Sequence, residues 1–461
     1  MARGCMPRGW LSVALAACLG LVGSAAAADA PAPGSATGPQ QQQQPGPQQQ
    51  PGPQQQSGPQ QQPGPQQQPG PPPGYGSFMG LPCPPPGPAD YSPCPPPCVG
   101  PTDNTQFKTP QFHLSFDYLY WYPRKSSLPP LVTSGNVADP LPAALGRPST
   151  QVLLQGTTLD DDQLQGGRIT LGVGTDSSSD WSFLLTAFLL EQGRRTLSFG
   201  DSGLGVSEVL GRPFFNLAAG VEDADRFASA GTFAGSLIVS QMRRFYGGDA
   251  DVYYEELCSD NNRIHLLAGV KVLTLDESLN FIRSSAGVVT GPAVGNFVTQ
   301  AESLAASNRF YGGQVGAQWE FRLGPVFLLA RGKVAFGVAD VNPNLTAFTQ
   351  TITPTSVTLV HNQGLYVSPS TAGRSHRSTF SVSPEADFRV GFDFNDWVRL
   401  SVGYTFIGLT DVTRAGDLIN RNVNPTTIAQ TVPVRSVVAP SPAGTSTFWA
   451  QGLDVSVRFS F

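Results

Sequence analysis

Apolar and polar residues alternate along several long segments of the chain. In 453–461 every odd position is apolar and every even position is small or polar, and the same period of two recurs in 112–120, 380–393 and 398–406. A period of two over about eight residues predicts β-strands that have one apolar and one polar face. Few segments show the period of a helix, so the sequence predicts an all-β fold.

The gaps between the predicted strands alternate between short and long. Short polar gaps lie at 175–180, 258–262, 322–325 and 395–397, and long gaps lie at 123–165, 192–241, 276–307, 339–378 and 410–446. These four short and five long gaps separate ten strands, or twelve if 236–241 belongs to an additional pair. A secreted β-sandwich has no reason to place every long connection at one end, whereas outer-membrane barrels combine short periplasmic turns with long outer loops.

The surrounding lipid then dictates how such strands are arranged. Because lipid offers no partner to an unpaired backbone N–H or C=O, the sheet must close on itself, with apolar faces toward lipid and polar faces toward the lumen. We therefore expect an antiparallel transmembrane β-barrel of about 10–12 strands in 107–461. A secreted sandwich, which would bury the apolar faces in a core, is the alternative. Aromatic residues gather toward strand ends, as interface girdles do: Tyr118, Tyr120, Trp121, Trp181, Tyr246, Trp319, Trp397, Tyr404 and Trp449.

The first residues have the pattern of an export signal. Basic residues precede an apolar run at 10–22 and small residues at 24–28, so we expect a signal peptide at 1–28. A lipoprotein box ending at Cys18 is the rival interpretation, although the apolar run continues beyond it. Residues 29–106 repeat the unit PGPQQQ and are predicted to form a disordered Pro/Gln/Gly-rich tether, either a plain spacer or a ligand for the cell wall.

Composition and cysteine usage narrow the compartment and the partners. The formal charge of −5 leaves no basic excess that could neutralise phosphates, which argues against a nucleic-acid partner. Disulfides are favoured over zinc for Cys83, Cys94, Cys98 and Cys258, because no second pair of ligands follows; their pairing stays open. We expect a bacterial outer-membrane protein with its tether in the periplasm. Its expected partners are outer-membrane lipid, the barrel assembly machinery and the cell wall.

Charged residues of both signs occupy the predicted lumen faces. They are Asp117, Arg168, Asp249, Asp251, Glu255, Lys271, Glu320, Arg331, Lys333, Glu385, Asp387, Arg389, Arg399, Asp454 and Arg458. In a narrow lumen such charges should pair across the barrel, because isolated charges would be poorly solvated. Barrels of about eight strands are filled by side chains and wide water channels need about sixteen, so the predicted size argues against a general diffusion pore. A selective passive pore for small solutes or ions and a non-conducting structural barrel, which anchors the envelope or presents surface loops, both stay open.

No arrangement in the sequence predicts catalysis, a cofactor or a metal site. His113 and Asp117 share one strand face, but they are four residues apart, roughly 13 Å by the strand rise, which is too far for a hydrogen bond. Acidic runs at 160–162 and 222–225 lack the ligand spacing of an EF-hand and predict solvated loops. We therefore expect no enzymatic activity.

Motifs of one bacterial family recur throughout the predicted barrel. The matching stretches are LPPLVTSG (128–135), GRPFFN (211–216), GVEDADRFA (220–228), RIHLLAGVKVLTLDESL (263–279), RFYGGQVG (309–316), RGKVAFGV (331–338), VGYTFIGLTDVTRAGDLINRNVNPT (402–426) and FWAQG (448–452). In these stretches the chain resembles a family of bacterial, planctomycete-type outer-membrane β-barrel porins. The resemblance covers about 112–461 and implies an outer-membrane barrel; the porin activity of that family is itself inferred, and no catalytic residue carries over.

An internal repeat supports a shared hairpin design. The pentapeptide RFYGG occurs at 244–248 and again at 309–313, each time before a strand that runs to a short turn. Tyr246 and Tyr311 are expected to face outward at the same depth.

The last strand ends on an aromatic residue and is expected to pair with the first strand near 112–120. Phe459 and Phe461 at the end of an alternating strand are typical of the signal that barrel assembly machinery reads. Deletion of Phe461 should therefore lower the yield of folded barrel in the membrane more than it lowers the unfolding temperature of barrel that has folded. Heat-modifiable gel migration of membrane fractions measures the first quantity and thermal unfolding of the purified protein the second. Equal assembly of the truncated chain would contradict the assignment.

Overall fold

The computed structural model describes residues 112–160, 163–174, 181–259, 261–287, 295–361, 363–425 and 444–461. Among these residues, ten strands form one closed antiparallel barrel. In chain order they are β1 (Phe112–Pro123), β4 (Leu164–Gly174), β5 (Trp181–Leu190), β9 (Phe233–Cys258), β10 (Asn262–Gly287), β11 (Phe297–Leu323), β12 (Val326–Ile352), β15 (Arg377–Asp393), β16 (Val398–Val412) and β18 (Ser446–Ser460). Each pairs with the next, and β18 pairs with β1 from Ala450 to Ser460, which confirms the predicted barrel. The segment 236–241 belongs to β9 and forms no additional barrel pair.

Closure of the barrel extends to the last residue. The backbone N–H of Phe461 donates to the carbonyl of Phe112 at 2.9 Å, and the two rings lie 5.9 Å apart between centroids. The side chain of Phe459 faces outward beside Leu114 and Val398, its register partners on β1 and β16. Both candidate residues of the assembly signal therefore lie at the seam that closes the sheet.

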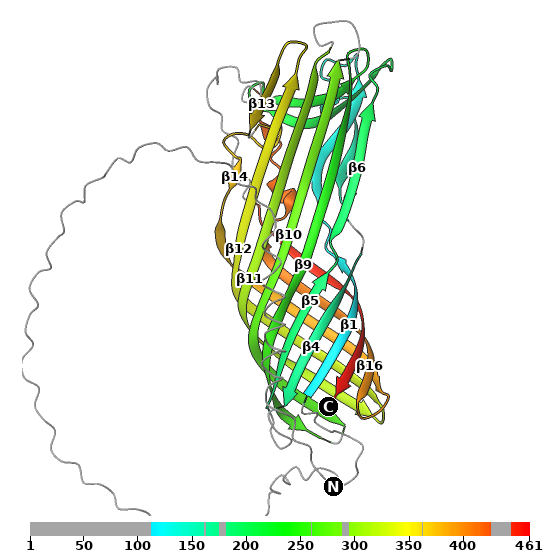
Figure 1. The fold of residues 1–461 in the computed structure, drawn as a ribbon, viewed down its shortest axis with the longest axis vertical. Coiled ribbons are helices and arrows are strands. Elements are labelled where there is room, and N and C mark those ends of the chain that lie inside the picture. Colours follow the sequence, from blue (N-terminus) through cyan, green and yellow to red (C-terminus); the bar gives the residue numbers. More distant parts are fainter. Residues whose placement is uncertain are drawn as a thin grey trace, which may run out of the picture. The chain divides into compact units, whose positions relative to one another are not determined.

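The two ends of the barrel differ (Figure 1). Short connections join β4 to β5, β9 to β10, β11 to β12 and β15 to β16 at the end where Phe461 lies, which we call the turn end. The opposite end, the loop end, carries shorter elements. They are β2 (Leu128–Asn136), β3 (Gln151–Gly156), β6 (Gly193–Asp201), β7 (Glu208–Asn216), β8 (Val221–Ser229), β13 (Val357–His361), β14 (Gly373–Arg374), the 3-10 helix η2 (Ala415–Leu418) and β17 (Asn422–Val423). No helix among the described residues is long and apolar enough to cross a membrane.

Four strands continue far beyond the barrel at the loop end. β9 to β12 are 26 or 27 residues long, whereas the other barrel strands have 10 to 17. Residues 276–287 and 297–307 were predicted to be loop, but they pair with each other as the upper parts of β10 and β11. The predicted gap 339–378 is also strand as far as Ile352, and 192–241 contains β6, β7, β8 and the first part of β9.

The two faces of these long strands exchange polarity along their length. In β10, Val270 and Val272 point outward and are exposed, while Lys271 points inward. Further along, Leu279 and Phe281 are the buried inward residues, and the outward positions Asp276, Ser278 and Asn280 are polar. The alternation therefore continues with its phase reversed, because the outward face meets lipid near the barrel and water beyond it.

The level at which polarity reverses marks the end of the lipid-facing surface. Val272, Tyr311 and Val338 are register neighbours, all exposed on the outer face. The prediction of Trp121 as a girdle residue was wrong: its side chain points inward, is 0% exposed and donates its indole N–H to Asp454 at 2.8 Å. Its position in the strand is odd, as is that of the lumen residue Asp117, so the alternation places it inside.

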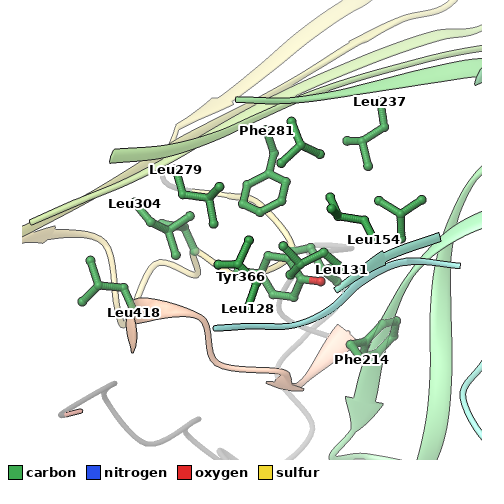
Figure 2. Close-up of a cluster of buried hydrophobic side chains, with 14 of the residues drawn as sticks. Leu128, Leu131, Leu154, Phe214, Leu237, Leu279, Phe281, Leu304, Tyr366 and Leu418 are labelled. Atoms are coloured by element: carbon green, nitrogen blue, oxygen red, sulfur yellow. The ribbon is translucent and has the colours of Figure 1, made fainter. Parts of the chain in front are cut away.

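Beyond the barrel, the inward face of the long strands packs against the shorter elements of the loop end (Figure 2). Leu279, Phe281 and Leu304 from β10 and β11 face Leu131 of β2 and Leu154 of β3. Residues of β7, β8 and η2 join the same buried cluster. We call this unit, formed by the upper parts of β9 to β12 with β2, β3, β7, β8 and η2, the head.

An arginine buried in the head ties several of these segments together. Arg212 of β7 is 0% exposed and lies over the rings of Phe281 and Tyr366, at 4.8 and 4.6 Å from their centroids. Its guanidinium forms an ion pair with Glu302 at 2.6 Å, and Glu302 also accepts the backbone N–H groups of Tyr366 and Val367. Burial raises the pKa of Tyr366 to about 12, so its ring stays neutral beside the carboxylate.

Substitution of one aromatic residue should loosen the head without opening the barrel. Phe281→Ala leaves a cavity beside Tyr366 and Arg212, and should cost about 3–5 kcal/mol of the free energy of unfolding of the head. Ile282→Ala, on the exposed outer face of the same strand, should cost about 0.5 kcal/mol or less. Limited proteolysis of the loop end in denaturant measures the difference, and heat-modifiable migration should report an intact barrel for both. Equal protease resistance would show that the cluster does not hold the head.

Candidate functional site: the barrel lumen

The turn end of the lumen opens into a wide polar vestibule. The cavity has a volume of about 1110 Å³, and its lining includes His113, His265, Glu320 and Arg458. Arg399 forms ion pairs there with Asp393 at 2.7 Å and with Glu320 at 3.3 Å. The vestibule ends inside the barrel at a layer of charged side chains that includes Asp117, Arg331, Asp387 and Arg389.

This layer is a continuous network of ion pairs between strands. Arg168 of β4 contacts Asp117 of β1 at 2.7 Å and Asp454 of β18 at 2.8 Å. Arg389 of β15 bridges Asp117 and Asp387, each at 3.0 Å. β1 pairs with both β4 and β18 in the sheet, so the contacts of Arg168 run along the barrel wall. β15 is separated from β1 by β16 and β18, so the pair between Arg389 and Asp117 reaches across part of the lumen.

Two lysines extend the network on the other side of the barrel. Lys333 of β12 lies 2.8 Å from Asp249, 3.5 Å from Asp251 and 3.2 Å from Glu385. Lys271 of β10, 1% exposed, also pairs with Glu385. A buried charge is tolerated only when it is paired and hydrogen-bonded. The buried lysines therefore depend on the carboxylates that pair with them.

The fifteen charged residues predicted for the lumen divide between the network and the vestibule. Arg331 pairs with Asp387 at 2.7 Å, and Glu255 lies 3.6 Å from Arg263 near the turn end. Sequence reasoning did not include Arg263, Arg322 and Asp393, which also line the vestibule. The alternation in 380–393 does place Asp393 on the polar face with Asp387, although it was not among the predicted lumen residues.

A hydrophobic layer closes the lumen above the charged network. It consists of Leu119, Trp121, Leu164, Phe188, Leu190, Phe245, Leu273, Leu275, Phe310, Ala335, Ile407, Leu409, Val412, Phe448 and Ala450, each at most 7% exposed. Every barrel strand except β15 contributes to it. The rings of Phe245 and Phe448 meet 4.9 Å apart between centroids, although β9 and β18 lie on different sides of the barrel. The layer therefore fills the lumen across its width.

The RFYGG repeat supplies two of these aromatic side chains. Phe245 and Phe310 are both 0% exposed within the layer. The following tyrosines, Tyr246 and Tyr311, lie on the opposite, outward face of their strands. The repeat thus places one ring inside the lumen and the next ring outside it.

A second set of buried ion pairs lies between the hydrophobic layer and the head. Arg243 of β9 contacts both Asp160 and Glu277, the latter at 2.7 Å, and Arg414 contacts Glu277 at 2.6 Å. Burial raises the pKa of Glu277, but the guanidinium groups of Arg414 and Arg243 outweigh burial and lower this pKa to about 2. The segments that carry Asp160 and Arg414 are therefore attached to the barrel wall by charges that persist at neutral pH.

The acidic runs differ from the solvated loops that the sequence predicts. Asp160 is 2% exposed and accepts a hydrogen bond from Gln241 at 2.7 Å, whereas 161–162 lie outside the described residues. In the second run, Glu222 pairs with Arg421 and Asp225 with Arg283, each at 2.6 Å. Within the described parts of the chain, no group of three or more His, Cys, Asp or Glu side chains is placed to hold a metal ion.

Comparison with known proteins identifies the family. The chain matches the family model described as Putative beta barrel porin-7 (BBP7) over residues 113–461. No curated protein sequence matches it.

Solved structures similar to the chain include outer-membrane proteins. The outer-membrane protease OmpT from Escherichia coli is 9% identical with a TM-score of 0.36, over 78% of this chain and 99% of that chain. A Pseudomonas aeruginosa FadL homologue is 8% identical with a TM-score of 0.21, over 76% and 90%. The Pseudomonas putida toluene transporter TodX is 8% identical with a TM-score of 0.15, over 78% and 91%. Similarity this low says nothing about activity.

The family match spans the whole described barrel, from its first strand to its closing strand. The chain therefore belongs to the beta barrel porin-7 family of outer-membrane β-barrels.

Proposed function

We propose that the protein is a closed outer-membrane barrel that anchors its head at the cell surface and does not conduct solutes in this conformation. The observation that carries the proposal is the hydrophobic layer, which fills the lumen with side chains from nearly every strand. Apolar constrictions gate pores by excluding water, and ions with it. In the charged network beneath this layer, side chains of opposite sign pair with each other. These paired charges are therefore not available to bind a permeating ion.

The same proposal assigns the two ends of the barrel to two compartments. Outer-membrane barrels place short turns in the periplasm and long loops outside, so the head lies at the cell surface and the turn end in the periplasm. The segment 29–106, which precedes β1, then enters from the periplasmic side. We assign no enzymatic role, because the carboxylates of the lumen form ion pairs with neighbouring arginines and lysines.

Conductance in planar bilayers tests the closed barrel. The purified full chain should give no conductance steps, whereas Phe245→Ala/Phe310→Ala, which removes two rings from the hydrophobic layer, should give measurable current. The control is Tyr246→Ala/Tyr311→Ala, which changes the neighbouring outward positions on the same strands and should stay silent. Stable steps from the unchanged protein would favour the passive pore for small solutes or ions.

Deletion of 29–106 tests the anchoring role. If this segment attaches the barrel to the cell wall, the shortened protein should lose co-sedimentation with cell-wall material while its barrel keeps heat-modifiable migration. A chain in which the segment has the same composition in scrambled order separates a sequence-specific ligand from a plain spacer. Unchanged co-sedimentation after deletion would exclude the segment as the anchor.

A further inference from the structure

The outward face of the head carries a polar hollow just beyond the lipid-facing surface. It has a volume of about 560 Å³ and lies over the middle of β9 to β12. Arg244, Asp276, Ser307 and Asn342 lie side by side across the four strands in register, and all line the hollow. Arg309, Arg374, Asn344, Ser278 and Ser375 complete much of its polar lining.

The hollow carries an excess of positive charge. Its outward-facing charged side chains are Arg244, Arg309 and Arg374 against one carboxylate, Asp276, which accepts a hydrogen bond from Ser307 at 2.6 Å. Arg243 and Glu277 also border it, but their side chains point inward and pair with each other. Arg244 donates to Gln192 at 3.2 Å, and among the described residues no carboxylate forms an ion pair with any of the three outward arginines.

The position of these arginines along their strands places them at the height of lipid headgroups. Arg244 lies two residues from the outward Tyr246, and Arg309 lies two residues from the outward Tyr311. In both strands the arginine is nearer to the loop end than the tyrosine. Two residues of strand span about 7 Å. The headgroup layer on each side of the hydrocarbon is about 5–8 Å thick. The guanidinium groups therefore face sideways into the layer where lipid phosphates lie.

We propose that this hollow binds the phosphate of an anionic lipid headgroup in the leaflet at the loop end. Guanidinium groups pair with phosphate oxygens through parallel hydrogen bonds, and the Ser and Asn side chains around them supply further donors to a polar headgroup. The occupant is assigned to lipid and not to a free anion because the hollow opens outward at the height of the headgroups. The inference is independent of whether the lumen conducts.

Native mass spectrometry of the full chain in detergent measures this binding directly, with dioleoylphosphatidylglycerol and dioleoylphosphatidylcholine as probes. The unchanged protein should retain phosphatidylglycerol in preference to phosphatidylcholine. Arg244→Gln/Arg309→Gln should weaken phosphatidylglycerol binding about tenfold or more, since each arginine at a membrane surface contributes substantially to attraction of anionic lipid. Addition of Arg374→Gln should weaken it further.

A matched variant separates the hollow from total charge. Arg124→Gln/Arg226→Gln removes the same two charges from exposed positions of the loop end that do not line the hollow, and should leave binding unchanged. Heat-modifiable migration verifies that all variants are folded. Equal loss in both double variants, equal retention of the two lipids, or full competition by equimolar inorganic phosphate would each overturn the proposal.

Discussion

The need to pair every backbone polar group within the membrane is the constraint on which this structure depends. An open sheet would leave an edge of unpaired N–H and C=O groups in lipid, at several kcal/mol each. The ladder between β1 and β18 removes that edge, and it continues to the hydrogen bond from Phe461 to Phe112. Once the sheet closes with ten strands, the width of the lumen is set, and side chains are long enough to meet across it.

The polar side chains of the lumen are accommodated in two different ways along the barrel axis. Near the turn end the lumen opens into a polar vestibule, and deeper inside it pairs charges from separate strands, as Arg168 does with Asp117 and Asp454. Such pairs add little net stability compared with apolar packing, but the loss of one partner leaves an uncompensated charge. Above them the inward faces become apolar and the rings of Phe188, Phe245 and Phe448 pack together. This change of lining is the observation on which the proposed closed barrel rests.

The strand pattern was largely predictable from the sequence, and the errors of this prediction have a physical cause. Alternation in 112–120, 380–393 and 398–406 identified barrel strands, because one face of each strand meets lipid along its whole length. The same reasoning assigned 276–287 and 297–307 to a loop, where the outward face of the strands becomes polar. These residues instead continue as strand with the opposite phase, since the head supplies an apolar partner on the inner side. The prediction for Asp160 was wrong for a similar reason. An acidic run predicts a solvated loop when only its neighbours in the sequence are considered. Asp160 is instead buried, because it pairs with Arg243, which is far away in the sequence and close in space.

The sequence by itself determined which segments are strands, which of their faces meets lipid, and that short and long connections alternate, because these properties depend only on neighbours along the chain. It also placed the charged residues on the lumen faces. The tertiary structure alone decided which of these charges meet, that Trp121 lies inside, and that Phe245 reaches Phe448 across the lumen. Those contacts depend on the relative register of strands around a closed sheet, and a shift of two residues in one strand preserves the alternation while changing every partner across the barrel.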